Sequence, residues 1–428
     1  MRLLLQALMV VLAMGTLVAL WATRESNRPS QAQVIIFVLM AGGLAGDPPY
    51  LDENTNFRAA MVALALGVFS LRLGPRHLPP TTKRALAGAV VLLWLWLALI
   101  DVLFADIGVD QLVAPLSSLA LLTLCGLASS PAGFTPRAIS RSLLAVMAPL
   151  VTATAFISDA WRPCDAFKCN GAGGFFMGPF ASENNLGAQA VVVFVWVLLG
   201  LTGWLRLAGS LFMLTLLAAT FSRTAMIAAL VCLVVFILLA LPARTHGLRS
   251  PATQPAPLGV AIAFGLAASG IGLWLVRSAA PGSFSNRGEI WRAAHDAFRE
   301  RPLVGLGLHR WFELQSIGRL PEHFAHSQYL LLAFAGGYIA VLLYAVVLAC
   351  GLRHCTSLPG QRWVGSLPVV ALAVVGMTEV AWNPFTFDGL SWPVLAVLLL
   401  SLDEPPGWAP GPPSRATSRG RARSRAGV

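Results

Sequence analysis

Charge is scarce in this sequence: 11% of its 428 residues are Asp, Glu, Lys or Arg, whereas 57% are hydrophobic. A soluble domain of this length could not bury so much apolar surface and still cover its exterior with so few charges. Nearly uncharged windows of about 18 or more residues recur along the chain, and this length crosses a hydrocarbon core about 30 Å thick. The composition therefore excludes an ordinary soluble protein and indicates a membrane protein.

Alternating strand patterns are also lacking. Transmembrane β-strands need short segments in which apolar and polar residues alternate, but the apolar runs here are continuous Leu, Val and Ala. Backbone groups in lipid must be satisfied within the segment, so we predict an all-α fold, a polytopic transmembrane helical bundle of about 12–13 spans. The predicted spans are Leu3–Ala22, Gln33–Gly46, Ala59–Leu73, Ala85–Phe104, Gln111–Ala128, Ser142–Ser158, Leu186–Leu201, Leu205–Phe221, Ala225–Leu241, Leu258–Val276, Ser327–Leu352, Trp363–Trp382 and Gly389–Leu402.

Acidic residues are fewer than basic ones, 19 against 30, which gives a net charge of +11. The excess does not indicate nucleic-acid binding, because the arginines gather in short loops and in the tail, as the positive-inside rule and contact with membrane lipids require. The basic loops, predicted to be cytoplasmic, are Pro75–Arg84, Pro131–Arg141, Pro242–Pro257, Leu352–Arg362 and the disordered tail 403–428. The acidic or neutral loops, predicted to be extracytoplasmic, are Asp47–Phe57, Ala105–Asp110 and Asn383–Asp388. We expect a multi-pass protein of the bacterial inner membrane, whose thirteen spans would place Met1 outside.

Two longer loops fall on the predicted outer side. Cys164 and Cys169 share the first, Asp159–Ser182, where they either form a local disulfide or remain free thiols. The second, Arg277–Ala325, holds seven arginines, which either bind an anionic substrate or pair with acidic residues of the loop, Asp296, Glu300 and Glu313. Its segment Arg287–Arg299 predicts an amphipathic helix along the membrane surface, followed by a turn at Gly305-Leu306-Gly307.

Ionisable residues at the ends of apolar runs are candidates for chemistry. Arg223 lies between two spans and Arg287 opens the loop helix, and a guanidinium suits phosphate oxygens. His326, at the end of the arginine-rich loop, can accept a proton from a hydroxyl near neutral pH. The alternatives are that Arg223 reaches lipid headgroups and that His326 caps the next helix. With His323 alone as a neighbour, His326 lacks a third ligand, so we predict no metal site.

Several motifs around these residues resemble the O-antigen ligase and O-antigen polymerase superfamily of bacterial membrane glycosyltransferases. In order, the motifs are Ser222-Arg223, Arg287-Gly288-Glu289-Ile290-Trp291, Pro302-Leu303-Val304-Gly305-Leu306-Gly307, and His326-Ser327-Gln328-Tyr329-Leu330 with Gly336-Gly337. The resemblance covers roughly residues 205–352, and Gly178-Pro179-Phe180 with Asn184 resembles the element just upstream. It implies a ligase-like core at 205–352 with its outer loop at 277–326. The apolar runs predict the N-terminal transmembrane helices at 1–204 and the C-terminal ones at 353–402.

The resemblance implies a metal-independent enzyme without a cofactor that acts in cell-surface polysaccharide biosynthesis, such as that of lipopolysaccharide. Its donor would be a glycan on undecaprenyl diphosphate, and its acceptor a hydroxyl of a glycan, lipid or protein outside the cytoplasm. Carried over by position, Arg223 and Arg287 would hold the diphosphate, and His326 would activate the acceptor. The expected substrate-binding residues are Arg292, Asn184 and Glu379.

One departure concerns Ser327, because the family usually has Asn after the histidine. The motifs do not distinguish a ligase from a polymerase. A transporter or flippase of a small solute or lipid-linked glycan is the alternative function, and for it Glu379 would couple protons unless it pairs with an arginine of the site. A membrane scaffold without activity is a third hypothesis.

Overall fold

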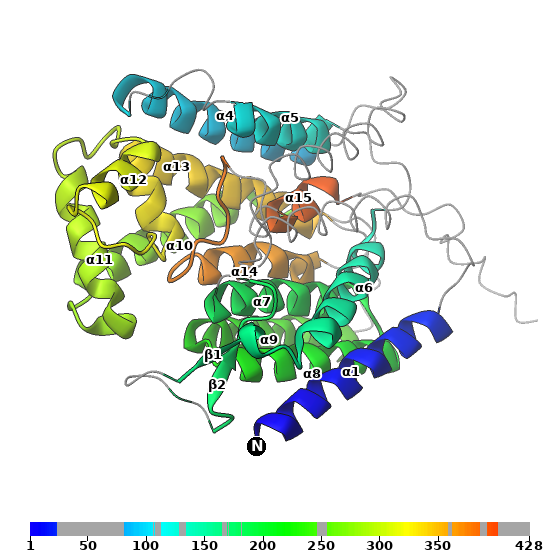
Figure 1. Ribbon diagram of the computed structural model, residues 1–428. Helices are drawn as coiled ribbons and strands as arrows, with labels where there is room; N and C mark the ends of the chain where they lie inside the picture. Colours follow the sequence, from blue (N-terminus) through cyan, green and yellow to red (C-terminus); the bar gives the residue numbers. More distant parts are fainter. Residues whose placement is uncertain are drawn as a thin grey trace, which may run out of the picture.

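The computed structural model consists almost entirely of helices that pack side by side (Figure 1). It describes residues 1–23, 81–105, 107, 113–127, 134–164, 169, 171–180, 182–245, 255–357, 362–385 and 392–400. The predicted spans Gln33–Gly46 and Ala59–Leu73, the loop Asp47–Phe57 and the tail 403–428 lie outside the described residues. All statements below concern the described part.

Seven of the described helices are long and apolar enough to cross a membrane, which confirms the predicted fold class. They are α1 (Arg2–Ala22), α4 (Thr81–Phe104), α7 (Glu183–Gly200), α8 (Gly203–Thr220), α9 (Arg223–Thr245), α10 (Leu258–Ser278) and α13 (Gln328–Thr356). Each coincides closely with a predicted span, because length and apolar composition alone decide where a helix can cross lipid.

The remaining helices are shorter or more polar. They are α5 (Val113–Leu127), α6 (Pro136–Thr154), α11 (Ser283–Phe298), α12 (His309–Ser316), α14 (Leu367–Val375) and α15 (Trp392–Leu399), with 3₁₀ turns η2 (Ser158–Ala160) and η3 (Arg362–Ser366). The prediction of one continuous span over Trp363–Trp382 is wrong: α14 ends at Val375, and the chain continues without helix to Trp382. Hydropathy could not locate this end, because several residues after Val375 are apolar and buried, like those of the helix before them.

The long loop between α10 and α13 enters a break in α13. Gly337 has a left-handed φ of 67° that interrupts the helix, and the loop segment 302–307 docks there. Leu306 N–H donates to the carbonyl of Phe334 (2.8 Å), and Tyr338 N–H donates to the carbonyl of Pro302 (2.9 Å). These bonds satisfy backbone groups that the break exposes, as buried non-helical backbone in a membrane protein requires. A Cβ at Gly337 would lie 2.1 Å from the carbonyl oxygen of Leu303, so only glycine permits this approach.

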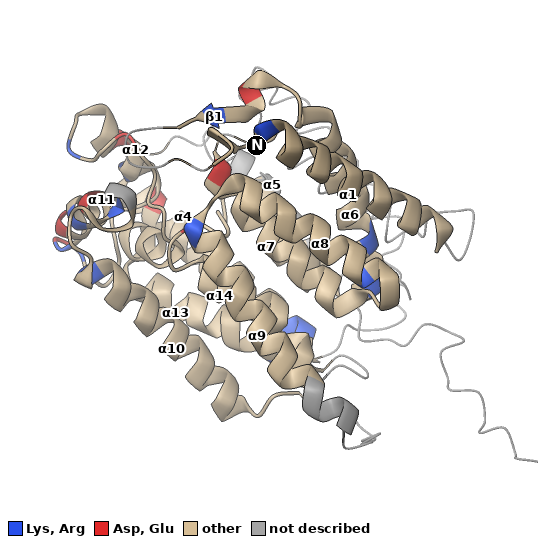
Figure 2. Ribbon diagram, turned by 90° about the horizontal axis from the view of Figure 1, so that it is seen from below, with Lys and Arg blue, Asp and Glu red and all other residues tan. Residues whose placement is uncertain are grey.

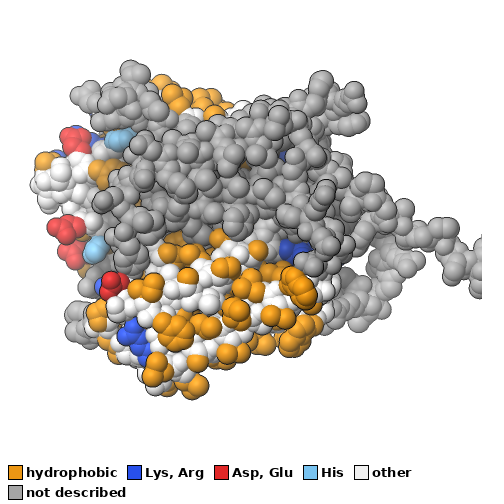
Figure 3. All heavy atoms as spheres, turned by 45° about the vertical axis from the view of Figure 1, so that its right-hand side comes forward, with side chains coloured by type: hydrophobic (Ala, Val, Ile, Leu, Met, Phe, Trp, Pro, Cys, Tyr) orange, Lys and Arg blue, Asp and Glu red, His pale blue; other side chains and the backbone are white. Residues whose placement is uncertain are grey.

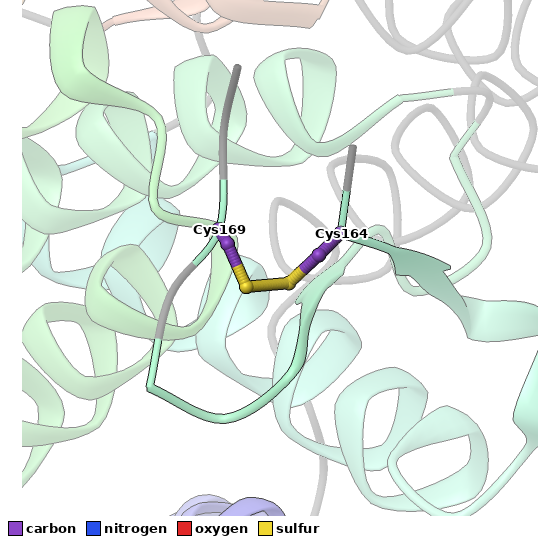
Figure 4. The surroundings of a disulfide bond; sticks show 2 residues. All are labelled: Cys164 and Cys169. Atoms are coloured by element: carbon purple, nitrogen blue, oxygen red, sulfur yellow. A yellow bond between two sulfur atoms is a disulfide. The ribbon is translucent and has the colours of Figure 1, made fainter. Parts of the chain in front are cut away.

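The first predicted outer loop contains a small hairpin, in which β1 (Trp161–Pro163) pairs antiparallel with β2 (Gly174–Phe176). A disulfide joins Cys164 to Cys169 at the end of β1, as one of the two sequence-based alternatives required (Figure 4). The N-terminus lies beside this hairpin, with the Arg2 guanidinium 4.7 Å from the Trp161 ring centre (Figure 1). Met1 and the hairpin of the loop Asp159–Ser182 therefore share one end of the bundle.

Charge is distributed unevenly over the molecule. Figure 2 shows ribbons of the bundle with few charged residues, while acidic and basic residues gather around α11 and α12. In Figure 3 apolar side chains cover much of the described surface of one face. Such side chains include Leu211 on α8 and Leu266 on α10, which are 43% and 49% exposed. Exposed leucines along helices with a single charged residue each are expected of a surface that faces lipid, and the chain is a multi-pass membrane protein.

Candidate active site

A buried carboxylate joins Arg287 and His326, the two candidates at the ends of the long loop between α10 and α13. Glu379, 4% exposed, accepts a hydrogen bond on Oε1 from Arg287 Nη2 (2.5 Å), while its Oε2 lies 3.2 Å from His326 Nδ1. The sequence predicts each of these residues separately as a site residue, and it leaves open that Glu379 pairs with an arginine of the site. The structure assembles them into one triad and places Glu379 between its partners, so that its carboxylate orients both side chains.

The position of Glu379 depends on the non-helical segment that follows α14. Gln328 N–H, at the start of α13, donates to the carbonyls of Gly376 (2.8 Å) and Glu379 (3.1 Å). The Gln328 side-chain oxygen accepts from Trp382 N–H at 2.9 Å. The segment thus curves around the first turn of α13. This turn begins just after His326, and its hydrogen bonds fix the backbone of Glu379.

His326 has an unusual backbone conformation, with φ of 45° in the left-handed region. A β-carbon makes this region unfavourable by about 1 kcal/mol or more, and such residues occur often at functional sites. The alternative that His326 caps the next helix is wrong, because Ser327 is the N-cap and its Oγ accepts from Leu330 N–H at 3.4 Å. Serine and asparagine are both preferred N-cap residues, so the departure at Ser327 preserves this local role.

Arg287 is carried by the amphipathic helix that the sequence predicted. The helix α11 runs over Ser283–Phe298 and buries its predicted apolar face, Ile290, Trp291, Ala294 and Phe298. The Trp291 indole N–H donates to the carbonyl of Ala325 (2.9 Å), which ties α11 to the residue before His326. Arg287 also donates through Nη1 to the carbonyl of Thr378. Because a guanidinium has five N–H groups, these two bonds leave others for a ligand.

Arg223, Arg292 and Asn184 have no hydrogen bond or ion pair to the triad among those of the described residues. Arg223 is the first residue of α9, exposed and without a described hydrogen-bond or ion-pair partner. The helix α9 packs against α14, which precedes Glu379 in the chain. Arg292 is exposed on α11, and Asn184 is half-buried in the first turn of α7. The roles predicted for these residues stay predictions.

Two of the other arginines of the long loop pair with acidic residues of the same loop. Arg299 Nη1 lies 3.4 Å from Asp296 Oδ1, and Arg310 is hydrogen-bonded to Glu313, as the alternative of local pairing required. Of the loop arginines, only Arg287 contacts the triad's carboxylate in the described structure. No group of three His, Cys, Asp or Glu side chains that could hold a metal ion occurs among the described residues. The absence of a metal stays a prediction.

Sequence reasoning missed a second histidine–carboxylate pair. Asp101, fully buried near the end of α4, accepts from His309 N–H (3.1 Å) on Oδ1, and its Oδ2 lies 3.0 Å from His309 Nδ1. This hydrogen bond raises the pKa of the His309 imidazole above its usual value, although partial burial opposes the shift. A lone Asp within a predicted span was the signal that could have revealed the pair. The pair fastens the first residue of α12 to the bundle.

Comparison with known proteins gives one finding. Residues 208–345 match the family model described as O-antigen ligase. No curated protein matches the chain. The matched region includes Arg223, Arg287 and His326, whereas Asp101 and Glu379 lie outside it.

Proposed function

We propose that the chain, whose residues 208–345 match the family model described as O-antigen ligase, transfers a glycan from an undecaprenyl-diphosphate donor to a hydroxyl acceptor on the extracytoplasmic face of the bacterial inner membrane. A function of the O-antigen ligase or polymerase type follows from the family in general, as do a lipid-linked glycan and an acceptor as substrates. The identity of the lipid carrier, the face of the membrane and the independence from metal belong to the proposal.

The observation that carries the proposal is the triad of Arg287, Glu379 and His326. Glu379 engages Nδ1 of His326, which leaves Nε2 free to act toward a substrate. His326 is about 25% exposed at its side chain, whereas Glu379 is about 6% exposed. A partly exposed imidazole held by a buried carboxylate is the arrangement that a general base requires.

The reaction would proceed by displacement at the sugar. His326 Nε2 takes the proton of the acceptor hydroxyl as its oxygen attacks the anomeric carbon of the donor sugar. A new glycosidic C–O bond forms, and the C–O bond to the diphosphate breaks. The lipid diphosphate leaves with the bonding electrons, and the imidazolium formed at His326 is stabilised by the Glu379 carboxylate next to it.

Arginine side chains would stabilise the charge that develops on the leaving group. Arg287 lies on the opposite side of the Glu379 carboxylate from His326 and keeps N–H groups available after its bonds to Glu379 and Thr378. A guanidinium offers two parallel donors to phosphate oxygens and keeps its charge at any physiological pH. Arg223 would supply a second guanidinium, as the family motif at Ser222-Arg223 implies. The two cations would do what a metal ion does elsewhere, which supports the proposal of a metal-independent enzyme.

The direct test is reconstitution of transfer. The full-length protein, purified in detergent and returned to liposomes, is supplied with undecaprenyl-diphosphate glycan and with candidate acceptors, and the products are resolved by mass spectrometry. We expect transfer by the wild type in the presence of a chelator and its loss in His326→Ala. Failure of the wild type to transfer glycan to any acceptor, combined with uptake of glycan into the liposomes, would reject the enzyme in favour of a transporter. Transfer to a lipid core only would indicate a ligase, and elongation of the donor glycan would indicate a polymerase.

A further inference from the structure

A cavity lies at the end of the bundle opposite the triad. It is lined by α4, α10 and α13 and has a volume of about 500 Å³. The helix α13 begins next to the triad at Gln328, whereas Arg353 of the cavity lies 25 residues further along it. At 1.5 Å per residue this separates the two by about 35–40 Å, roughly the thickness of a membrane. The cavity, here called the α13 groove, is therefore distinct from the candidate active site.

The walls and floor of the α13 groove differ in side-chain size. Ala345 and Ala349, one turn apart on α13, are small and buried and contribute the floor. Leu258, Ile262 and Leu266 recur every four residues along α10 and form one wall. These three side chains are 44–55% exposed, so the groove is open toward the surroundings of the bundle. Because Leu258 and Leu266 are eight residues apart, this wall is about 12 Å long, which suits part of an extended hydrocarbon chain.

A tight helix contact lies near one end of the groove. Gly265 on α10 lies so close to α13 that a Cβ there would be 2.2 Å from the carbonyl oxygen of Ala345. Glycine at a helix interface lets two backbones approach closely in a membrane. The groove therefore runs from this contact toward the other end, where Arg353 and the first turn of α4 lie.

That other end is polar and basic. Arg353, Thr81 and Thr82 line it. Arg353 Nε is buried and has no hydrogen-bond partner in the part of the chain that the structure describes. A buried guanidinium N–H without a partner is costly, and a ligand with acceptor oxygens would satisfy it. The apolar trough and the unsatisfied cation at its end match a molecule with a hydrocarbon chain and an anionic headgroup.

We infer that the α13 groove binds an anionic phospholipid, with one acyl chain between α4 and α10 and the headgroup phosphate on Arg353 and the Thr81 hydroxyl. The lipid belongs to the leaflet opposite the triad, so it is not the glycan donor. By covering the exposed wall of α10 and pairing with Arg353, it stabilises the packing of α10 and α4 on α13. This binding does not depend on the proposed glycan transfer.

The test is lipid binding by native mass spectrometry on the full-length protein in mild detergent. Phosphatidylglycerol and phosphatidylcholine with identical acyl chains are titrated separately, and we expect the wild type to bind the anionic lipid about tenfold more tightly. Arg353→Gln should lose this preference, because it removes one charge-assisted contact of about 1.4 kcal/mol, or tenfold in affinity. Arg84→Gln is the matched control, since Arg84 is exposed in the same turn of α4 and does not line the groove.

A second variant tests the contact between the groove and the acyl chain. Ala349→Leu fills the floor of the groove and should weaken both lipids about equally, which keeps the inference testable if Arg353→Gln does not fold. An unchanged preference for phosphatidylglycerol in Arg353→Gln, or unchanged binding in Ala349→Leu, would overturn it. Inorganic phosphate at the same concentration should not displace the lipid. If undecaprenyl phosphate displaces phosphatidylglycerol at an equal or lower concentration, the assignment to phospholipid is wrong.

Discussion

Glu379 and His326 are 53 residues apart in the chain, yet Glu379 Oε2 lies 3.2 Å from His326 Nδ1. The contact forms because the segment after α14 curves around the start of α13, where Gln328 binds its backbone. The carboxylate is buried and shared with Arg287, so its negative charge is fixed between two cationic or potentially cationic partners. We propose from this relationship that Glu379 positions the histidine, and the first prediction follows from it.

Replacing Glu379 by Gln should lower glycan transfer by about 10²-fold, because His326 loses the charge that orients its ring and stabilises its protonated form. Steady-state transfer kinetics of the wild type and the variant check this effect. Glu379→Asp keeps the charge and should retain more activity than Glu379→Gln; the reverse order would contradict the positioning role.

His326→Gln should reduce transfer by about 10²–10⁴-fold, the usual contribution of a general base, while binding of the lipid diphosphate is little changed. His323→Gln is the matched control, because His323 is exposed three residues earlier in the same loop. Its transfer rate should stay within about twofold of the wild type, as for most surface substitutions. Equal losses in the two variants would argue that the loop, and not the His326 imidazole, is required.

Arg287→Lys should preserve folding but lower transfer at least about tenfold, because one ammonium cannot bridge Glu379 and Thr378 and still offer a fork to phosphate. Arg287→Ala should also destabilise the protein, by about 3–5 kcal/mol, since it leaves Glu379 buried without its cation. Thermal unfolding in detergent and transfer assays separate the two effects. Arg299→Ala removes only an exposed pair and should cost about 1 kcal/mol or less; comparable destabilisation by both would refute the buried pair.

The pair of Asp101 and His309 should make stability depend on pH. The folded pKa of His309 is raised above the unfolded value of 6.5, so its contribution is complete below about pH 6.5 and is lost as the pH rises through the folded value. The melting temperature of the wild type should exceed that of His309→Asn by most at pH 6, and the difference should shrink toward pH 9. Thermal scans across this range check the trend, with His323→Gln as a control whose difference from the wild type stays constant. A difference that grows with pH would contradict the raised pKa.

The disulfide between Cys164 and Cys169 tests the topology. In a Cys350→Ser variant, a membrane-impermeant maleimide applied to intact cells should label Cys164 and Cys169 only after reduction, because the other free cysteines, Cys125, Cys232 and Cys355, are buried. Labelling that requires lysis would place the hairpin inside the cell and overturn the predicted orientation. The two cysteines are 5 residues apart, so their replacement by serine should cost at most about 2 kcal/mol, because a short loop restricts the unfolded chain little.

Sequence patterns were sufficient to locate the long helices and the apolar face of α11. A long uncharged run is not stable when exposed to water, and in lipid it is stable only as a helix, so α4, α10 and α13 could be located from composition. The spacing of Ile290, Trp291, Ala294 and Phe298 likewise predicted α11, because a helix period places these side chains on one face. Arg287 and His326 stood out because polar groups next to apolar runs are rare.

Tertiary structure alone decided which of these residues meet. Trp363–Trp382 reads as one apolar span, and only the packing of α13 against the segment after Val375 ends the helix and brings Glu379 to Arg287 and His326. The pairing of Asp101 with His309, 208 residues away, and the docking of residues 302–307 in the break at Gly337 are equally non-local. The spacing of apolar residues shows which face of each segment contacts an apolar environment. It carries no information about which polar groups share that environment, because this depends on contacts between segments far apart in the chain.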